Sequence, residues 1–150
     1  MFLTIMLALH VVGVVLWIGG VGMVTAIILP AARSESSPSE GMRLFQVVEH
    51  RFAPLARWLV LLVGLTGVAM LWQLDLWDGF SSVAFWWLHA MVLLWLIFAA
   101  ILFVIEPLTS RRRRAPNLRR MQWLHALLLA ASLLTIAGVV AGSHGVSPFG

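Results

Sequence analysis

The sequence predicts an all-α integral membrane protein, and three observations support this fold class. Of its 150 residues, 61% are hydrophobic and only 11% are charged, whereas a soluble domain carries roughly 25% charged residues. The mean hydropathy is +0.98. Apolar stretches recur that are long enough to cross a bilayer, for which about 20 residues suffice. Because the polar segments between them are short, we expect residues 1–150 to form a single domain, an antiparallel four-helix bundle with up-down-up-down order.

The first two spans differ in how clearly the sequence marks their ends. The first is expected over residues 2–32, where the apolar run ends near Pro30. It has neither a basic N-terminal region nor a small-residue cleavage site, so we interpret it as a retained helix. The second is placed at residues 42–73, after a loop rich in Ser and Glu. Pro54 either starts a helix in this segment or kinks a longer one.

The third and fourth spans complete the bundle. The third is placed at residues 83–106 and ends before Pro107. The fourth is placed at residues 118–142, after a loop rich in arginine. Tryptophans cluster around the short loop between the second and third spans, as expected for an interfacial aromatic belt: Trp72, Trp77, Trp86 and Trp87.

The distribution of arginine predicts the orientation in the membrane. The first loop carries Arg33, Arg43 and Arg51, the third carries six arginines, and the second carries Asp75 and Asp78 but no basic residue. By the positive-inside rule the first and third loops are cytoplasmic, so both termini lie outside. We expect this multi-pass protein in the cytoplasmic (inner) membrane of a bacterium.

Composition also excludes several functional classes. The chain has no cysteine, which excludes disulfides, thiolate chemistry and iron–sulfur clusters. Its net charge of +4 comes from arginines in the loops, where they meet anionic lipid headgroups, and we expect no nucleic-acid partner. No Ser–His–Asp grouping or pair of carboxylates occurs within the spans, so a hydrolase site is not predicted.

The segment 9–20 places a histidine inside an apolar span. An ionisable residue there usually faces the bundle interior or a cofactor. On a helix, His10, Gly13, Trp17 and Gly20 share one broad face. Glycines beside a histidine allow a partner helix or a flat ligand to approach the backbone closely.

Helical rise gives the depth of each histidine. At about 1.5 Å per residue, His10 lies roughly 12 Å and His89 roughly 10 Å from the outer ends of their spans. Two imidazoles at one level predict a haem b with one histidine on each side of the iron. His125 lies near the inner end of the fourth span, and His50 reaches that level if the second span begins near residue 42. These two are candidates for a second, inner haem.

A haem also needs clearance, apolar walls and cations for its propionates. The candidates for clearance are Gly13, Gly20, Gly64, Gly67 and Gly138. Those for the apolar wall are Trp17, Phe85, Trp86, Trp87 and Met91. The candidates to pair with the propionates are Arg51 and Arg57. Simpler interpretations stay open for each group. A histidine within a span can hydrogen-bond a neighbouring carbonyl or hydroxyl, tryptophans can belong to the belt, and glycines can serve packing alone.

Short motifs resemble the HemJ-type protoporphyrinogen oxidase family over residues 7–141. They are Leu9-His10, Trp17-Ile18-Gly19-Gly20 and Pro30 in the first span; Pro54, Gly64-Leu65-Thr66-Gly67 and Trp72 in the second; and Trp87-Leu88-His89-Ala90 in the third. The resemblance implies haem b bound by His10 and His89, with electrons passed to a quinone or a respiratory chain. CopD-like copper-resistance domains are broader relatives.

Three departures from the HemJ pattern bear on the substrate. Met91 stands where the family usually has Lys, two residues after the second histidine. The family also has a Tyr and an Arg near the end of the first helix, whereas this chain has no Tyr and places Arg33 after Pro30. Trp123-Leu124-His125 is an addition that the pattern does not require. The resemblance therefore implies a redox relative that holds one or two haems, and leaves open whether it is an enzyme that oxidises protoporphyrinogen.

Two other hypotheses remain beside haem-dependent electron transfer. In a CopD-like copper-handling protein, imidazole and thioether groups would bind the metal; the candidates are Met23, Met70, Met91, Met121 and His144. In a structural or assembly subunit, lipid, a partner helix or a second copy of the chain in a homodimer would cover the spans, and the histidines would be dispensable.

Overall fold

The chain folds as an all-helical multi-pass membrane protein. The computed structural model describes residues 1–110 and 117–146, and these residues contain no strand. Its helices form four segments long and apolar enough to cross a membrane: Phe2–Ser34, Pro38–Gln73, Val83–Leu108 and Leu118–Ser143. The predicted all-α fold class is confirmed. The arginines at positions 111–114, on which the predicted orientation partly rests, lie outside the described residues.

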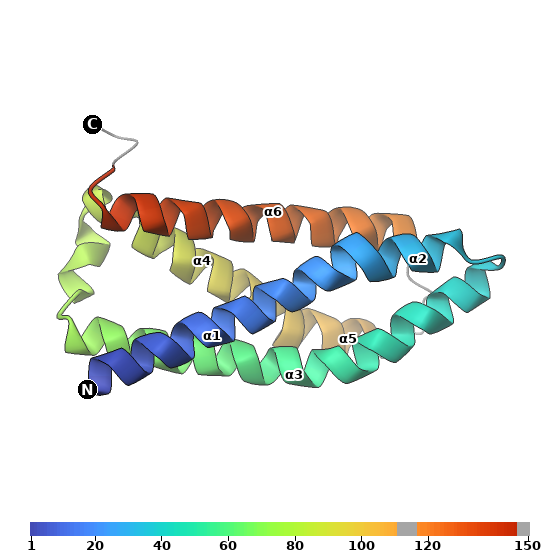
Figure 1. Ribbon diagram of the computed structural model, residues 1–150, viewed down its shortest axis with the longest axis horizontal. Coiled ribbons are helices and arrows are strands. Elements are labelled where there is room, and N and C mark those ends of the chain that lie inside the picture. Colours follow the sequence, from blue (N-terminus) through green and yellow to red (C-terminus); the bar gives the residue numbers. More distant parts are fainter. Residues whose placement is uncertain (111–116, 147–150) are drawn as a thin grey trace.

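Consecutive long helices run in alternate directions, and the start of α1 lies at the same end as the end of α6 (Figure 1). The first span consists of α1 (Phe2–Met23), the π-helical turn η1 (Val24–Ile28) and α2 (Leu29–Ser34), and the second of α3 (Pro38–Gln73). The third contains η3 (Val83–Phe85), α4 (Trp86–Ala100), the π-helical turn η4 (Ile101–Ile105) and α5 (Glu106–Ser110). The 3₁₀ turn η2 (Trp77–Ser81) precedes it, and α6 (Leu118–Ser143) forms the fourth.

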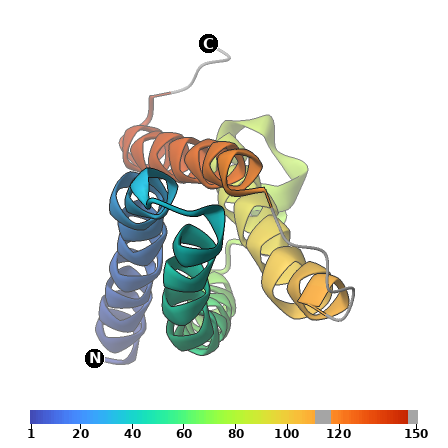
Figure 2. The same cartoon turned by 90° about the vertical axis from the view of Figure 1, so that its right-hand side faces the viewer.

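The bundle consists of two helix pairs. The most extensive contacts between long helices join α1 with α3 and α4 with α6. Seen from the end that carries α2, these pairs are splayed, with α6 lying across the top of α1 and α4 (Figure 2). His10 on α1 therefore lies against α3, whereas His89 on α4 belongs to the other helix pair.

The second span begins earlier than the residue 42 expected from its hydropathy. Ser37 is the N-cap of α3, and its hydroxyl oxygen accepts a hydrogen bond from the Glu40 backbone N–H at 3.2 Å. Pro38 occupies the first helical position, where its missing N–H costs nothing. The Ser37 hydroxyl in turn donates to Glu40 Oε2 at 3.1 Å, so the two residues form an N-terminal cap. Pro54 lies inside α3 and does not start a helix.

Both π-helical turns precede a proline. Pro30 follows η1 by two residues, and Pro107 follows η4 by two residues. A proline lacks the N–H for the carbonyl four residues earlier, and its ring pushes that carbonyl away, so the preceding turn widens. Near η4 the Arg57 Nε donates to Leu102 O, five residues before Pro107, at 3.1 Å, and in η1 the Thr25 hydroxyl donates to Val21 O in the preceding turn at 2.7 Å.

Large side chains fill notches at glycines between the helices. A Cβ added at Gly64 would lie 2.6 Å from the Trp95 ring, and one at Gly138 would lie 2.6 Å from the Trp86 ring. A Cβ at Gly20 would overlap the Phe52 ring. Because real Cβ atoms do not approach so closely, these positions require glycine for the observed packing.

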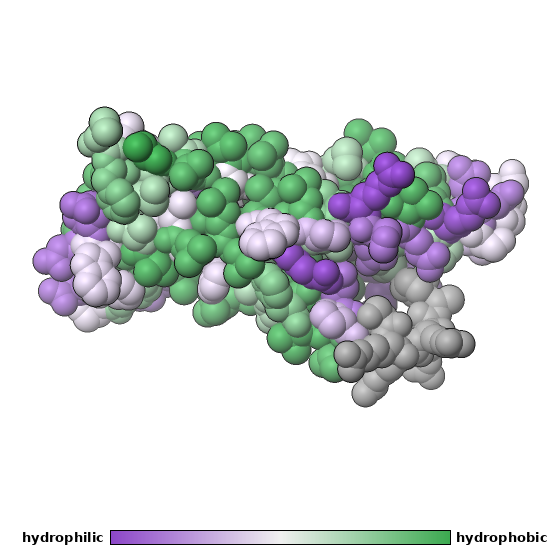
Figure 3. Space-filling model, turned by 90° about the horizontal axis from the view of Figure 1, so that it is seen from below, coloured by the Kyte–Doolittle hydropathy of each residue, from purple (hydrophilic) through white to green (hydrophobic). Residues whose placement is uncertain are grey.

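The surface has the distribution expected of a membrane-embedded bundle. Apolar residues cover most of the face in Figure 3, and hydrophilic residues gather mainly towards its two ends. Large apolar side chains along the spans are widely exposed, among them Val15 at 63%, Leu65 at 71% and Leu134 at 74%. In water such a surface would aggregate, whereas in a bilayer lipid covers it.

Candidate functional site around the histidines

His10 is held by α3 through one ring nitrogen. Its Nδ1 lies 3.0 Å from Val63 O and 3.1 Å from Thr66 Oγ1. A carbonyl oxygen can only accept, so Nδ1 carries the hydrogen and Nε2 keeps a lone pair. The Thr66 hydroxyl donates to Leu62 O at 2.7 Å, which leaves its oxygen free to accept from Nδ1. This arrangement fixes both the tautomer and the orientation of the imidazole.

The sequence around position 66 makes room for this contact. The His10 ring lies against Gly67, where an added Cβ would be 3.4 Å from Cε1. Thr66 is only 4% exposed. A histidine whose Nδ1–H is tied to a backbone carbonyl and whose Nε2 is free has the usual arrangement of a metal-ligating imidazole.

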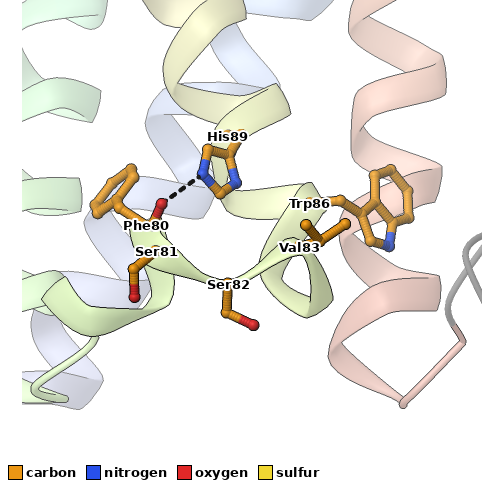
Figure 4. A pocket seen from close by; sticks show the side chains of 6 residues that line it. All are labelled: Phe80, Ser81, Ser82, Val83, Trp86 and His89. Carbon is orange, nitrogen blue, oxygen red and sulfur yellow. Dashed lines mark hydrogen bonds between the residues drawn. The ribbon is translucent and has the colours of Figure 1, made fainter.

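Both ring nitrogens of His89 face carbonyl oxygens. It lies in the first turn of α4, with Nδ1 3.0 Å from Phe85 O and Nε2 3.1 Å from Phe80 O. The Phe80 ring stands edge-on to the imidazole, with centroids 5.6 Å apart. We call residues 77–85 the strap, because they pass from η2 through η3 across this side of His89 (Figure 4). In this conformation Nε2 faces a carbonyl and is not available to a metal.

The two predicted ligands of the outer haem have separate partners. The polar contacts of His10 lie on α3, and those of His89 lie on the strap and the start of α4. Within residues 1–110 and 117–146, no hydrogen bond or ring contact joins the two imidazoles. Binding by both would require the strap to release Nε2 of His89.

Of the two inner histidines, His125 has the same arrangement of ring nitrogens as His10. His125 Nδ1 donates to Met121 O at 2.9 Å within α6, and its ring packs edge-on against Phe45 with centroids 6.5 Å apart. Its Nε2 has no described partner. His50 lies exposed on α3, and no described contact brings it to His125.

The other predicted cofactor contacts mostly serve the packing of the chain itself. Trp17 is 3% exposed and packs at right angles to Phe98, with centroids 4.7 Å apart. Arg57 Nη2 donates to Glu106 Oε1 at 2.8 Å, so its charge is already paired. Four of the glycines proposed for clearance receive side chains of this chain instead: Gly13 receives Val63, Gly20 receives Phe52, Gly64 receives Trp95 and Gly138 receives Trp86.

In the described part of the chain, the histidines stand outside any larger group of metal-ligating side chains. The described residues contain no group of three or more His, Cys, Asp or Glu side chains placed to hold a metal ion. A haem held by two imidazoles does not need such a group. An open hollow of about 300 Å³ lies beside His89, lined by Phe80, Ser81, Ser82, Val83 and Trp86.

Two polar partners of the histidines were not singled out by the sequence reasoning. Thr66 appeared only within the motif Gly64-Leu65-Thr66-Gly67, and Phe80 contributes a backbone carbonyl that no side-chain pattern reveals. A threonine followed by glycine within an apolar span was the available signal for the first. For the second, the sequence carried none.

Comparison of the chain with models of known families, with curated proteins and with solved structures finds no match.

Proposed function

We propose that this protein binds haem b within the membrane and takes part in electron transfer or another membrane redox reaction. The supporting observation is His10, whose Nδ1–H is tied to Val63 O inside an apolar span while Nε2 keeps its lone pair. Burying such a polar group among membrane helices is costly unless it serves a purpose. When bound, haem b supplies a one-electron change at its iron.

The residues fit this group in part. His10 offers Nε2 without rearrangement, whereas His89 offers Nε2 only after it separates from Phe80 O. Space for the porphyrin must come from movement of side chains that now occupy glycine notches, such as Trp95 at Gly64. In this proposal Val63 and Thr66 hold the His10 ring in the ligating tautomer. The HemJ-like motifs support the same assignment of His10 and His89.

A second, inner haem is the finer part of the proposal. His125 supports it because Nδ1 is tied to Met121 O and the half-buried ring packs against Phe45. His50 would have to approach from α3 to be the other ligand. Two stacked haems would give electrons a path across the bilayer, between an outer donor and an inner acceptor such as a quinone or a respiratory-chain component.

The proposed setting is the cytoplasmic membrane of a bacterium, with both termini outside. The end of the bundle with Arg33 in α2 and Arg43 and Arg51 in the first part of α3 would then face the cytoplasm, in agreement with the positive-inside rule. The strap and Asp75 would lie at the outer surface. His10 and His89 would occupy the outer half of the membrane.

The experiment is an absorption spectrum of the full chain purified in detergent, oxidised and reduced, with haem counted per chain. A Soret band that His10→Ala abolishes and His144→Ala preserves would support the proposal. His144 is the matched control because its Nδ1 is likewise tied to a carbonyl, Val140 O at 2.8 Å, but beyond the bundle. Protein without haem absorbance after growth with a haem precursor would reject it, and copper bound instead would favour the CopD-like alternative.

A further inference from the structure

Two carbonyl oxygens compete for the single N–H of a neutral His89 ring. Its two ring nitrogens face two carbonyl oxygens, Phe85 O at 3.0 Å and Phe80 O at 3.1 Å. A neutral imidazole has one N–H, so it can donate to only one of them. The other carbonyl then faces a nitrogen lone pair, and that contact is not a hydrogen bond.

We propose that residues 77–82 of the strap form a lid beside His89 whose opening is coupled to the tautomer of the ring. With the hydrogen on Nε2, His89 donates to Phe80 O and holds the lid closed. With the hydrogen on Nδ1, the ring donates to Phe85 O, loses its bond to the lid and presents the Nε2 lone pair. The net charge is the same in both states.

The open tautomer is the one that the other intramembrane histidines already adopt. His10 and His125 each direct Nδ1 at a carbonyl oxygen, on Val63 and Met121 respectively. In His125 this carbonyl lies four residues earlier on the same helix, as Phe85 does for His89. The open state therefore needs no new geometry within α4.

Distinct backbone conformations mark both limits of the lid. Just before it Asp75 adopts a left-handed conformation with φ of 50°, and at its last residue Ser82 is extended. Between them Gly79 packs under Phe85 and Leu88, and the Phe80 ring covers one edge of the imidazole. In Figure 4 the lid passes beside His89, with Phe80 on one side and Trp86 directed away from the ring. The hollow beside it gives the lid room to shift.

Any group that binds Nε2 must select the open state, because the lid and the ligand compete for the same nitrogen. That this ligand is haem iron rests on the proposed function. The lid itself does not, and it can be tested on protein without haem.

A disulfide from the lid to position 85, the residue before α4, can hold the lid closed in the full chain. The native sequence has no cysteine, so Gly79→Cys with Phe85→Cys introduces the only pair. A Cβ at position 79 would lie 3.2 Å from Phe85 Cγ, which places the two Cβ atoms within reach of a disulfide. Reduction of the same protein gives the matched control.

The readout is carbethoxylation of His89 by diethyl pyrocarbonate, which needs a free lone pair, followed by peptide mass spectrometry with His144 as internal reference. We expect oxidation to slow the reaction of His89 at least about fivefold, as expected for retention of one hydrogen bond. Reduction should restore the wild-type rate. Equal rates in the oxidised and reduced forms would overturn the proposal.

A second variant keeps the test valid if the cysteine pair does not fold. Phe80→Ala removes the ring from the imidazole edge but keeps the backbone, and it should speed carbethoxylation of His89. An unchanged rate would contradict the lid. Ring ¹⁵N chemical shifts of His89 should move towards the Nδ1–H tautomer in this variant. If haem never binds but the rates still follow the disulfide, the proposed function fails and the lid stands.

Discussion

Arg57 on α3 reaches across the bundle to Glu106 at the start of α5, with Nη2 2.8 Å from Oε1. The same guanidinium donates through Nε to Leu102 O, in the π-helical turn η4. One side chain thus fastens the second span to the third at two points. Both side chains are largely covered, at 34% and 25% exposed.

Loss of this fastening should destabilise the bundle. We expect Arg57→Gln to lower the free energy of unfolding by about 1–3 kcal/mol, because it removes the charged donor shared by the Glu106 carboxylate and Leu102 O. Reversible unfolding in mixed micelles, followed by tryptophan fluorescence, measures this. Arg51→Gln is the control, since Arg51 is exposed and has no described partner; equal effects of both variants would contradict the argument.

Adjacent glycines on α1 should respond oppositely to the same substitution. A Cβ at Gly20 would overlap the Phe52 ring, whereas one at Gly19 would meet nothing within 4 Å. Gly20→Ala should cost about 1–3 kcal/mol through overpacking. Gly19→Ala should stabilise by several tenths of a kcal/mol up to about 1 kcal/mol, because alanine favours the helix. Unfolding curves of the two variants, recorded side by side, decide this, and Phe52→Ala should relieve the cost at Gly20.

The sequence predicts the helices well because membrane crossing requires long apolar runs, whatever the packing. Hydropathy misplaces the start of α3 although its signal is present: Ser37, Pro38 and Glu40 form an N-terminal cap outside the apolar run. Hydropathy alone favoured residue 42. The π-helical turns follow from Pro30 and Pro107, but where the extra residue is accommodated depends on contacts such as that of Arg57.

The site was harder to predict because it depends on the register between helices. His10 meets Val63 and Thr66, which lie 53 and 56 residues away in sequence. Depth along the membrane suggested that His10 and His89 share a level, but depth does not say which neighbour each ring faces. The side chains that fill the glycine notches, such as Phe52 at Gly20, are likewise invisible until the pairs of helices are known.

Thr66 should tune haem retention without being a ligand. Thr66→Val keeps the shape but removes the hydroxyl that Nδ1 of His10 contacts at 3.1 Å. If the proposed function holds, haem should dissociate about 10–100 times more readily, as for loss of other outer contacts to a ligating histidine. Transfer of haem to apomyoglobin measures the rate. Thr4→Val, on the exposed side of α1, is the control; the same rate in Thr66→Val as in wild type would show that Val63 O alone fixes the ring.

Pro107 should determine whether Arg57 can reach its partners. In Pro107→Ala the new N–H can bond to Phe103 O, so the turn η4 is expected to contract to an ordinary α-helix. Because the wide turn accommodates one extra residue, its contraction rotates the segment that begins at Glu106 by about 100° relative to α4. Arg57→Gln should then cost less than about 0.5 kcal/mol in the Pro107→Ala background, against about 1–3 kcal/mol in the native chain. A double-mutant cycle on the free energy of unfolding measures this coupling, with Pro30→Ala, the proline after the other π-helical turn, in place of Pro107→Ala as the control. Full additivity of Pro107→Ala and Arg57→Gln would show that packing, and not the proline, maintains the wide turn.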